Sequence, residues 1–340
     1  MAQSATERPA WPVYFATKVA AIAGNTFVES VRQPVYGALV GSAIALILVS
    51  PYITMFTLQQ SPRLITDMGL ATVLLAGLLL AAFTASSVIS HELENRTVLT
   101  VLAKPVGRGE FIIGKFIGVL LGLTVATYLL SLALVLTVSG GALEADIEQE
   151  LSLTVVLSLF GSMFLAICYG LYSNFFNDRP FTSRAIGALV PLFTIFFVLF
   201  FFVNPREFTI QIGKGIDLKI VLACVMLLWS ILILAGVAIA ASTRLNVVVN
   251  ITFCSGVFLL GLLSDYLFRQ KGGDYLFGKI LYRTIPNLQA FWISDYLTGQ
   301  NPLLPLYLPQ LVIASGLYAF FLLAALLFLS MLLFQRRQVA

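Results

Sequence analysis

Charged residues are scarce in this sequence. Asp, Glu, Lys and Arg make up 11% of the 340 residues, whereas soluble globular domains carry roughly 25%. Hydrophobic residues make up 59% of the chain, and the mean hydropathy is +0.96. This composition excludes an ordinary soluble domain and predicts an integral membrane protein.

Cysteine and histidine are rare as well. The three cysteines, Cys168, Cys224 and Cys254, fall inside apolar runs, without the spacing of a zinc site or a disulfide framework. The one histidine, His91, stands beside Glu92 at the end of an apolar run, with no Ser or Cys at a matched spacing. The sequence therefore predicts no catalytic centre, no metal site and no cofactor bound by this chain.

Eight stretches are long and apolar enough to cross a bilayer, which takes about 20 residues. They cover residues 35–56, 68–90, 116–138, 151–172, 185–203, 220–241, 247–266 and 310–334. The predicted fold is an all-α, polytopic membrane protein, with a cytoplasmic N-terminus over residues 1–34 and a single transmembrane domain over 35–340.

The basic residues are unevenly distributed between the two sides of these spans. Twelve of the 20 Lys and Arg residues fall on the side of the termini, and the connections on the other side hold the remaining eight. This excess predicts that both termini are cytoplasmic and that the chain is a multi-pass protein of the inner (plasma) membrane. The basic residues form no dense patch, so nucleic-acid binding is not expected.

The segment before the first span predicts an amphipathic helix over residues 12–32. Its polar face would hold Lys18, Asn25, Glu29 and Arg32, and its apolar face Ala16, Ala20, Ala23, Phe27 and Val31. We expect this helix to lie in the cytoplasmic membrane interface. A soluble amphipathic helix that packs on a partner is the alternative.

The spans contain almost no ionisable side chains. Within the boundaries above, Asp265 near the end of the seventh span is the only acidic or basic residue. Ion-coupled carriers keep intramembrane carboxylates or histidines as relays. Their absence disfavours a secondary carrier, although backbone carbonyls of broken helices can also coordinate ions.

Small residues recur four positions apart in two places. Gly37 and Gly41 form one pair, and Gly114, Gly118 and Gly122 form a double pair in the third span. This spacing predicts close helix packing, either within one bundle or along a dimer or translocation seam.

The connection between the second and third spans combines charged and apolar residues. Glu92, Glu94 and Arg96 leave the second span, an apolar stretch around Leu102 follows, and Pro105 and Gly107 then break the chain direction. This pattern predicts a short helix on the membrane surface.

From Gly109 the chain also reads G-x-x-x-x-G-K, but the next residue is Phe116 instead of a Mg²⁺-binding Ser or Thr. Because no β-strand precedes it and a span follows, we interpret the P-loop likeness as coincidental and Lys115 as an interface anchor.

This connection resembles the coupling helix of permease subunits of ABC type-2 exporters. The residues that carry the resemblance are Glu92, Glu94, Thr97, Leu102, Lys104, Pro105, Val106, Arg108, Phe111, Gly114 and Lys115. Within that family the chain looks most similar to the group associated with copper-enzyme maturation. The resemblance implies that the coupling segment, residues 91–115, docks on a separate cytoplasmic ABC ATPase subunit. ATP and Mg²⁺ would then belong to that partner.

The chain departs from the usual six spans of the family by an added pair over about residues 151–203. Two connections could therefore form a second coupling turn, 174–184 or 242–246. The second, with Ser242 and Arg244, is preferred because the span and the long outer segment after it follow the family order.

That outer segment, residues 268–309, has apolar residues every three or four positions, which predicts one or two amphipathic helices broken near Pro286. It would form either a gate at the exit or a cap over the bundle.

The predicted function is the permease subunit of an ATP-driven transporter, expected to export its cargo. It would pair with itself or with a related permease and lie in the lipid bilayer. Apolar spans with few polar groups accommodate lipids, hydrophobic drugs, peptides or polysaccharide, so the cargo class stays open. The alternatives are a non-transporting scaffold that recruits a cytoplasmic partner and, less favoured, a secondary carrier or channel.

Overall fold

The computed structural model describes residues 11–54, 61–94, 107–141, 153–203, 216–271, 279, 282, 284–294 and 304–335. Within these residues, eight helices are long and apolar enough to cross a membrane, and each coincides with one of the predicted spans. The described part of the chain contains no β-ladder. The all-α, polytopic fold predicted from the hydropathy pattern is therefore confirmed.

Most of the helices extend beyond the predicted apolar stretch at one end or at both. The long helices are α1 (Trp11–Arg32), α2 (Pro34–Thr54), α3 (Ser61–Glu94), α5 (Arg108–Gly141), α6 (Leu153–Asn177), α7 (Phe181–Phe202), α8 (Leu218–Ser242), α9 (Val247–Ser264) and α12 (Leu304–Gln335). A break at Gln33 separates α1 from α2, which starts at Pro34, a residue suited to the first helical turn.

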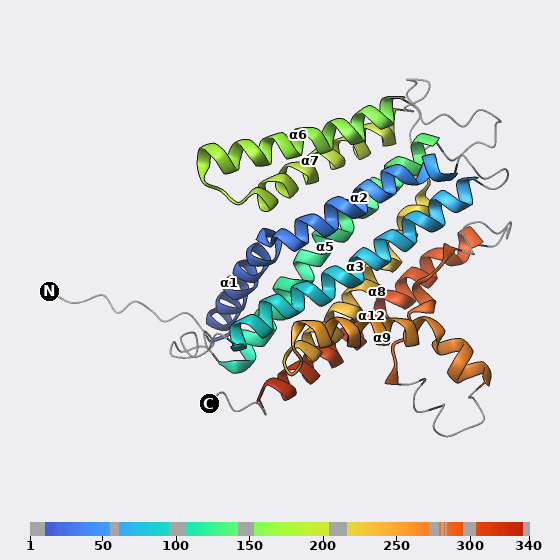
Figure 1. Ribbon diagram of the computed structural model, residues 1–340. Helices are drawn as coiled ribbons and strands as arrows, with labels where there is room; N and C mark the ends of the chain where they lie inside the picture. Colours follow the sequence, from blue (N-terminus) through green and yellow to red (C-terminus); the bar gives the residue numbers. More distant parts are fainter. Residues whose placement is uncertain are drawn as a thin grey trace.

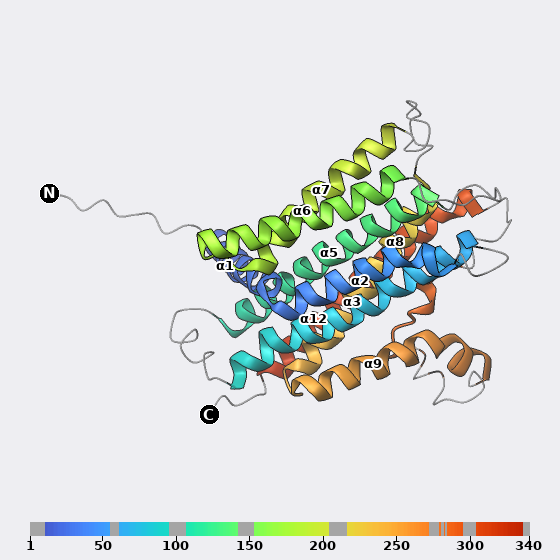
Figure 2. The ribbon, with the colours of Figure 1, turned by 45° about the horizontal axis from the view of Figure 1, so that its top comes forward.

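Three spans form the centre of the bundle. In their most apolar windows, 67% of the residues of α3, 67% of α5 and 72% of α8 are buried, against 17% in α12. Figure 1 shows α6 and α7 as a hairpin on one side of the bundle. Figure 2 places α9 at the edge opposite that hairpin. The peripheral helices therefore present most of their side chains outward, as lipid-facing spans do.

The first turn of α1, the end of α3, the start of α5 and the end of α12 lie at one end of the bundle (Figure 1). The rings of Phe111 in α5 and Phe334 in α12 stack there with their centroids 5.9 Å apart. The guanidinium of Arg244, just after α8, donates a 2.9 Å hydrogen bond to the carbonyl of Leu333. We call this the coupling end, because the coupling segment leaves and rejoins the bundle here.

The outer segment is described only in part, and its chain breaks near Pro286, as predicted. Residues 284–294 contain a bend at Ile285, followed by the 3-10 helix η2 (Gln289–Phe291). The Leu288 N–H donates a 3.1 Å hydrogen bond to the Gly261 carbonyl of α9. Leu288, Phe291 and Ile293 are buried. This stretch packs against α8 and α9, and burial of these side chains accounts for its irregular backbone.

Candidate coupling site and membrane cavities

The coupling segment is described only where it joins the bundle. Glu92 and Glu94 lie in the last turn of α3, and Arg108 is the first residue of α5. The remaining predicted coupling residues of this segment, Arg96, Thr97, Leu102, Lys104 and Pro105, lie outside the described residues. The site can therefore be built from the helices that hold the two ends of the segment.

The start of α5 is fixed by a reciprocal cap. The Glu110 carboxylate accepts a 2.8 Å hydrogen bond from the Gly107 N–H, and the Phe111 N–H donates to the Gly107 carbonyl at 3.1 Å. A Glu in the first turn that reaches back to the residue before the helix satisfies a backbone donor that the helix itself cannot. The G-R-G-E sequence of residues 107–110 carries this signal, because Glu110 stands three residues after the residue that precedes the helix.

Helix α1 packs along the first half of α5, and the glycines of the third span face it. A Cβ added at Gly114 would meet Ile22 at 2.6 Å, and one added at Gly118 would meet the Ala23 carbonyl oxygen at 2.6 Å. At Gly122 an added Cβ would lie 3.4 Å from Ser30. Successive glycines along α5 face residues that come successively later in α1. The two helices therefore run in the same direction in close contact.

The buried row of α1 differs from the predicted apolar face. Val19, Ala23, Thr26 and Ser30 are buried against the glycines, whereas Ala16 and Ala20 are exposed. Small side chains are needed where two backbones come close, even when they are polar, and the Ser30 hydroxyl donates internally to the Thr26 carbonyl at 2.8 Å. The residues of α1 that face α5 are therefore small, and not all of them are apolar.

Two ion pairs join α1 to the start of α5. The Lys115 ammonium lies 3.2 Å from the Glu29 carboxylate, and the Lys18 ammonium lies 3.7 Å from Glu110. Lys115 is 3% exposed and its ammonium lies 5.8 Å from the centroid of the Phe111 ring. The expectation that Lys115 is an interface anchor is thus wrong: its side chain is buried because α1 covers it.

The preferred second coupling turn, residues 242–246, has one buried and one accessible predicted residue. Ser242 is 1% exposed, and its hydroxyl donates to the Ile239 carbonyl at 2.8 Å, so it is unavailable to a partner. Arg244 is exposed. The Asn246 side chain accepts a 3.1 Å hydrogen bond from the Val249 N–H and caps α9. Of the two predicted residues, only Arg244 presents its side chain at the surface.

The alternative turn, residues 174–184, comprises the end of α6, the connection over residues 178–180 and the start of α7. Its Asn174 amide donates to the Arg179 carbonyl at 3.0 Å, and Asp178 adopts a left-handed conformation with φ of 51°. Phe175 and Phe176 are 80% and 74% exposed, the highest values among the large apolar residues described. This turn also presents an exposed arginine, Arg179, so the structure leaves two arginine-bearing turns as candidates.

A buried polar network ties the end of α3 to the helices that flank residues 242–246. The Asn250 amide of α9 donates to the Ser86 hydroxyl of α3 at 2.7 Å and to the Ala238 carbonyl of α8 at 3.2 Å. The Cys254 thiol lies 3.6 Å from Oδ1, the side-chain amide oxygen of Asn250. Hydrogen bonds of this kind between membrane helices contribute about 1 kcal/mol each. The helix leading into the coupling segment is therefore joined to α8 and α9.

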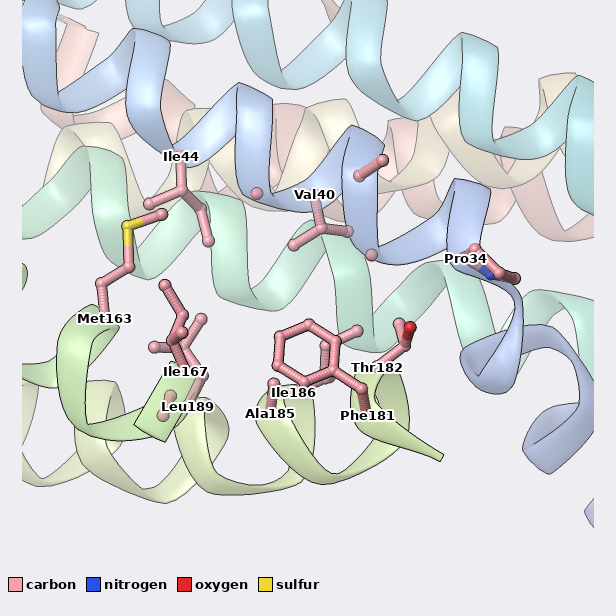
Figure 3. A pocket seen from close by; sticks show the side chains of 14 residues that line it. Pro34, Val40, Ile44, Met163, Ile167, Phe181, Thr182, Ala185, Ile186 and Leu189 are labelled. Carbon is pink, nitrogen blue, oxygen red and sulfur yellow. The ribbon is translucent and has the colours of Figure 1, made fainter. Parts of the chain in front are cut away.

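Gly37 and Gly41 of α2 line an apolar cavity of about 400 Å³ between α2, α6 and α7. Figure 3 shows Val40 and Ile44 of α2 facing Ile186 and Leu189 of α7 across it. An added Cβ at Gly37 would meet the Thr182 side chain at 2.5 Å, but one at Gly41 would meet nothing within 4 Å. Gly37 is thus a close helix contact, and Gly41 is not.

Two further cavities lie between membrane helices. One, of about 530 Å³, is bounded by α8, α9, α12 and residues 284–286, with Arg244 among its lining residues. The other, of about 310 Å³, is bounded by α5, α7 and α8 and is lined in part by the hydroxyl residues Thr124, Thr127, Tyr128 and Ser131. The Tyr128 hydroxyl lies 2.9 Å from the Thr194 hydroxyl beside it.

Among the residues that the structure describes, no group of three or more His, Cys, Asp or Glu side chains is placed to hold a metal ion. The exposed cysteine, Cys168, is on α6, whereas Cys224 and Cys254 are buried in α8 and α9.

Comparison with known proteins gives two matches. Residues 17–206, more than half of the chain, match the family described as ABC-2 family transporter protein. That match includes α6 and α7, the pair predicted to be an addition to a six-span pattern. The "Probable ABC transporter permease protein NosY" of Pseudomonas aeruginosa is 34% identical over 140 residues, which cover 39% of this chain and 47% of that protein. The chain thus aligns with about half the length of this curated relative.

Proposed function

This chain belongs to the ABC-2 transporter family, and on that premise we propose that it is the permease subunit of an ATP-driven exporter, powered by a separate ATPase that binds the coupling end. The observation that supports the proposal is the close contact of α1 with the start of α5, where the coupling segment rejoins the bundle. A segment that transmits force needs a stiff attachment. Here three glycine contacts and two ion pairs supply one.

The transmission would work as a rigid-body shift. ATP binding by the partner would move the coupling segment, and α1 would follow because α5 and α1 are in backbone contact at Gly118. The end of α3 would carry the same motion to α8 and α9 through Asn250. Two such permeases, identical or related, would pair around the cargo path, together with two ATPase copies.

A nucleotide site on this chain is disfavoured by the surroundings of the P-loop-like residues. Gly114 is covered by Ile22 and by the Val19 carbonyl oxygen, and the Lys115 ammonium pairs with Glu29. A phosphate would need open backbone N–H groups and an accessible lysine at these positions. The proposal therefore assigns ATP and Mg²⁺ to the partner chain.

Charge reversal in the coupling segment tests this function. Glu94→Lys and Arg108→Glu are each expected to lower stimulation of the ATPase by the reconstituted permease about tenfold, which corresponds to about 1.4 kcal/mol of lost interaction. Lys219→Glu is the matched control, because Lys219 is exposed at the start of α8, at the end of the bundle away from the coupling segment. Thermal unfolding of each variant checks that the spans remain folded.

The outcomes separate the candidate functions. Stimulated hydrolysis together with ATP-dependent cargo movement supports the exporter, and loss of both in the two reversals assigns coupling to residues 91–115. Unchanged stimulation by both reversal variants would contradict the proposal. ATPase binding without transport would support the scaffold, and flux that needs no ATP would support a carrier or channel.

A further inference from the structure

The groove between α8, α9 and α12 has the shape and charge of a lipid site, and we propose that it binds one anionic phospholipid of the surrounding membrane. In this assignment an acyl chain lies along the groove and the phosphate contacts Arg244. The proposal requires only that the chain spans a membrane and does not depend on its coupling to an ATPase.

The walls of the groove are apolar along its length. Four leucines of α12, spaced by four, three and four residues, form one wall, and they are Leu322, Leu326, Leu329 and Leu333. Phe253 and Val257 of α9 form the opposite wall. On α8 the small side chains of Ala240 and Ala241 leave the space of about 530 Å³ between them. This is the size of a cavity that holds a small ligand, about 300–1,000 Å³.

The length of the groove matches one leaflet. Leu322 and Leu333 are three helical turns apart, which at 1.5 Å per residue is about 16 Å. Half of a hydrocarbon core about 30 Å thick is about 15 Å. Thr284 and Pro286 also line the groove. A chain that enters at the coupling end and follows the α12 wall would thus reach about the middle of the bilayer.

The sides of the groove are open to the membrane. Leu329 and Phe253 are 44% and 47% exposed, so a lipid can enter laterally between α9 and α12. Figure 2 shows α9 at the edge of the bundle, and only 28% of the residues in its most apolar window are buried. A groove of this kind in a bilayer is filled by acyl chains, because a void forfeits dispersion contacts along its whole lining.

Arg244 supplies the charge at the mouth of the groove. Its guanidinium donates one hydrogen bond to the Leu333 carbonyl, whereas an arginine carries five N–H donors in a fork that suits phosphate oxygens. On the predicted orientation this mouth faces the cytoplasmic leaflet, whose anionic lipids favour basic pockets between membrane helices. The same hydrogen bond also caps α12, so a purely structural role for Arg244 is the competing explanation.

The test is a lipid titration of the purified full-length permease by native mass spectrometry, with phosphatidylglycerol and phosphatidylcholine of identical acyl chains. The wild-type chain is expected to bind phosphatidylglycerol about tenfold more tightly, the ratio that one charge-assisted contact gives. Arg244→Gln should reduce this preference to less than threefold, and Arg244→Lys should keep most of it. Arg179→Gln is the matched control, because it removes another exposed arginine, in the turn between α6 and α7.

A second pair of variants tests the groove itself. Ala241→Leu fills it and should weaken binding of both lipids at least fivefold, whereas Ala185→Leu makes the same change in the cavity beside α2 and should not. Retained preference in Arg244→Gln would overturn the proposal. Equal loss of thermal stability in Arg244→Gln and Arg244→Lys, with the lipid preference unchanged in both, would assign Arg244 to the cap of α12. Conversion of a dimer to a monomer by Ala241→Leu would show that a second copy occupies the groove, which also contradicts the proposal.

Discussion

The chain carries two glycine motifs with the same spacing, and the structure uses them differently. Along α5, Gly114, Gly118 and Gly122 bring α1 into contact over two turns. Along α2, Gly37 contacts Thr182 of α7, but Gly41 faces the open cavity of about 400 Å³ that Figure 3 shows. The motif in α5 forms a continuous contact between two helices, whereas the motif in α2 forms one close contact beside a cavity.

The difference shows what a small residue contributes. A glycine permits two helices to approach closely, but the side chains of the facing helix determine whether they do. The α1–α5 contact has polar reinforcement from Glu29 and Lys18 at its sides, whereas the lining between α2, α6 and α7 is almost entirely apolar. We therefore expect α1 and α5 to move together, and α6 and α7 to be less tightly held against α2.

The largest effect is expected from Gly118→Ala. The new Cβ would lie 2.5 Å from the Thr26 Cβ and 2.6 Å from a backbone carbonyl oxygen of α1, so the helices must separate. Overpacking of this kind costs about 1–3 kcal/mol, and we expect the upper half of that range because backbone cannot rotate away. Thermal unfolding of the purified permease measures the cost, and an unfolding temperature equal to that of wild type would contradict a close α1–α5 contact.

A smaller loss is expected from Glu29→Gln, which removes the carboxylate that faces the buried ammonium of Lys115. Breaking a fully buried ion pair costs about 3–5 kcal/mol, and Glu29 is 38% exposed, so we expect about 2 kcal/mol or less. The double variant Glu29→Gln with Lys115→Met should recover most of the loss, because no charge then stays buried. A double variant less stable than Glu29→Gln alone would assign Lys115 a stabilising role apart from this pair.

The smallest effect is expected from Gly41→Ala, the matched counterpart of Gly118→Ala. Nothing lies within 4 Å of the added Cβ, and alanine favours a helix over glycine by up to about 1 kcal/mol. The variant should therefore unfold at the wild-type temperature or slightly above it. A destabilisation equal to that of Gly118→Ala would mean that the cavity between α2, α6 and α7 closes in the membrane, and the contrast between the two motifs would fail.

The sequence predicts the spans well because a bilayer imposes a simple demand. A segment such as 220–241 must stay apolar over about 20 residues to cross it, and this can be counted without a structure. The family was likewise predictable, because the resemblance between residues 92 and 115 depends on residue types at fixed spacing. The match over residues 17–206 confirms that resemblance.

The contacts between helices were not predictable in the same way. The spacing of Gly114, Gly118 and Gly122 indicates a close neighbour but does not identify α1 as that neighbour. Lys115 was expected at the interface because lysines at span ends usually extend toward water, and only the position of Glu29 on α1 explains its burial. Ser242 was expected to contact a partner, although its hydroxyl bonds within its own helix. Such outcomes depend on tertiary neighbours that are distant in sequence.

We expect α1 and the start of α5 to act as one rigid body during the ATP-driven cycle, and a reversible cross-link between them measures whether they do. An added Cβ at Gly122 lies 3.4 Å from Ser30, close to the about 3.5–4.5 Å that joins the two Cβ atoms of a disulfide. Ser30→Cys with Gly122→Cys, in a background where the exposed Cys168 is replaced by Ser, can be oxidised and reduced in the reconstituted transporter. We expect the same permease-stimulated ATP hydrolysis, within about twofold or 0.4 kcal/mol, in both states. Hydrolysis that stops on oxidation and returns on reduction would show that α1 slides along α5, and would contradict a rigid α1–α5 unit.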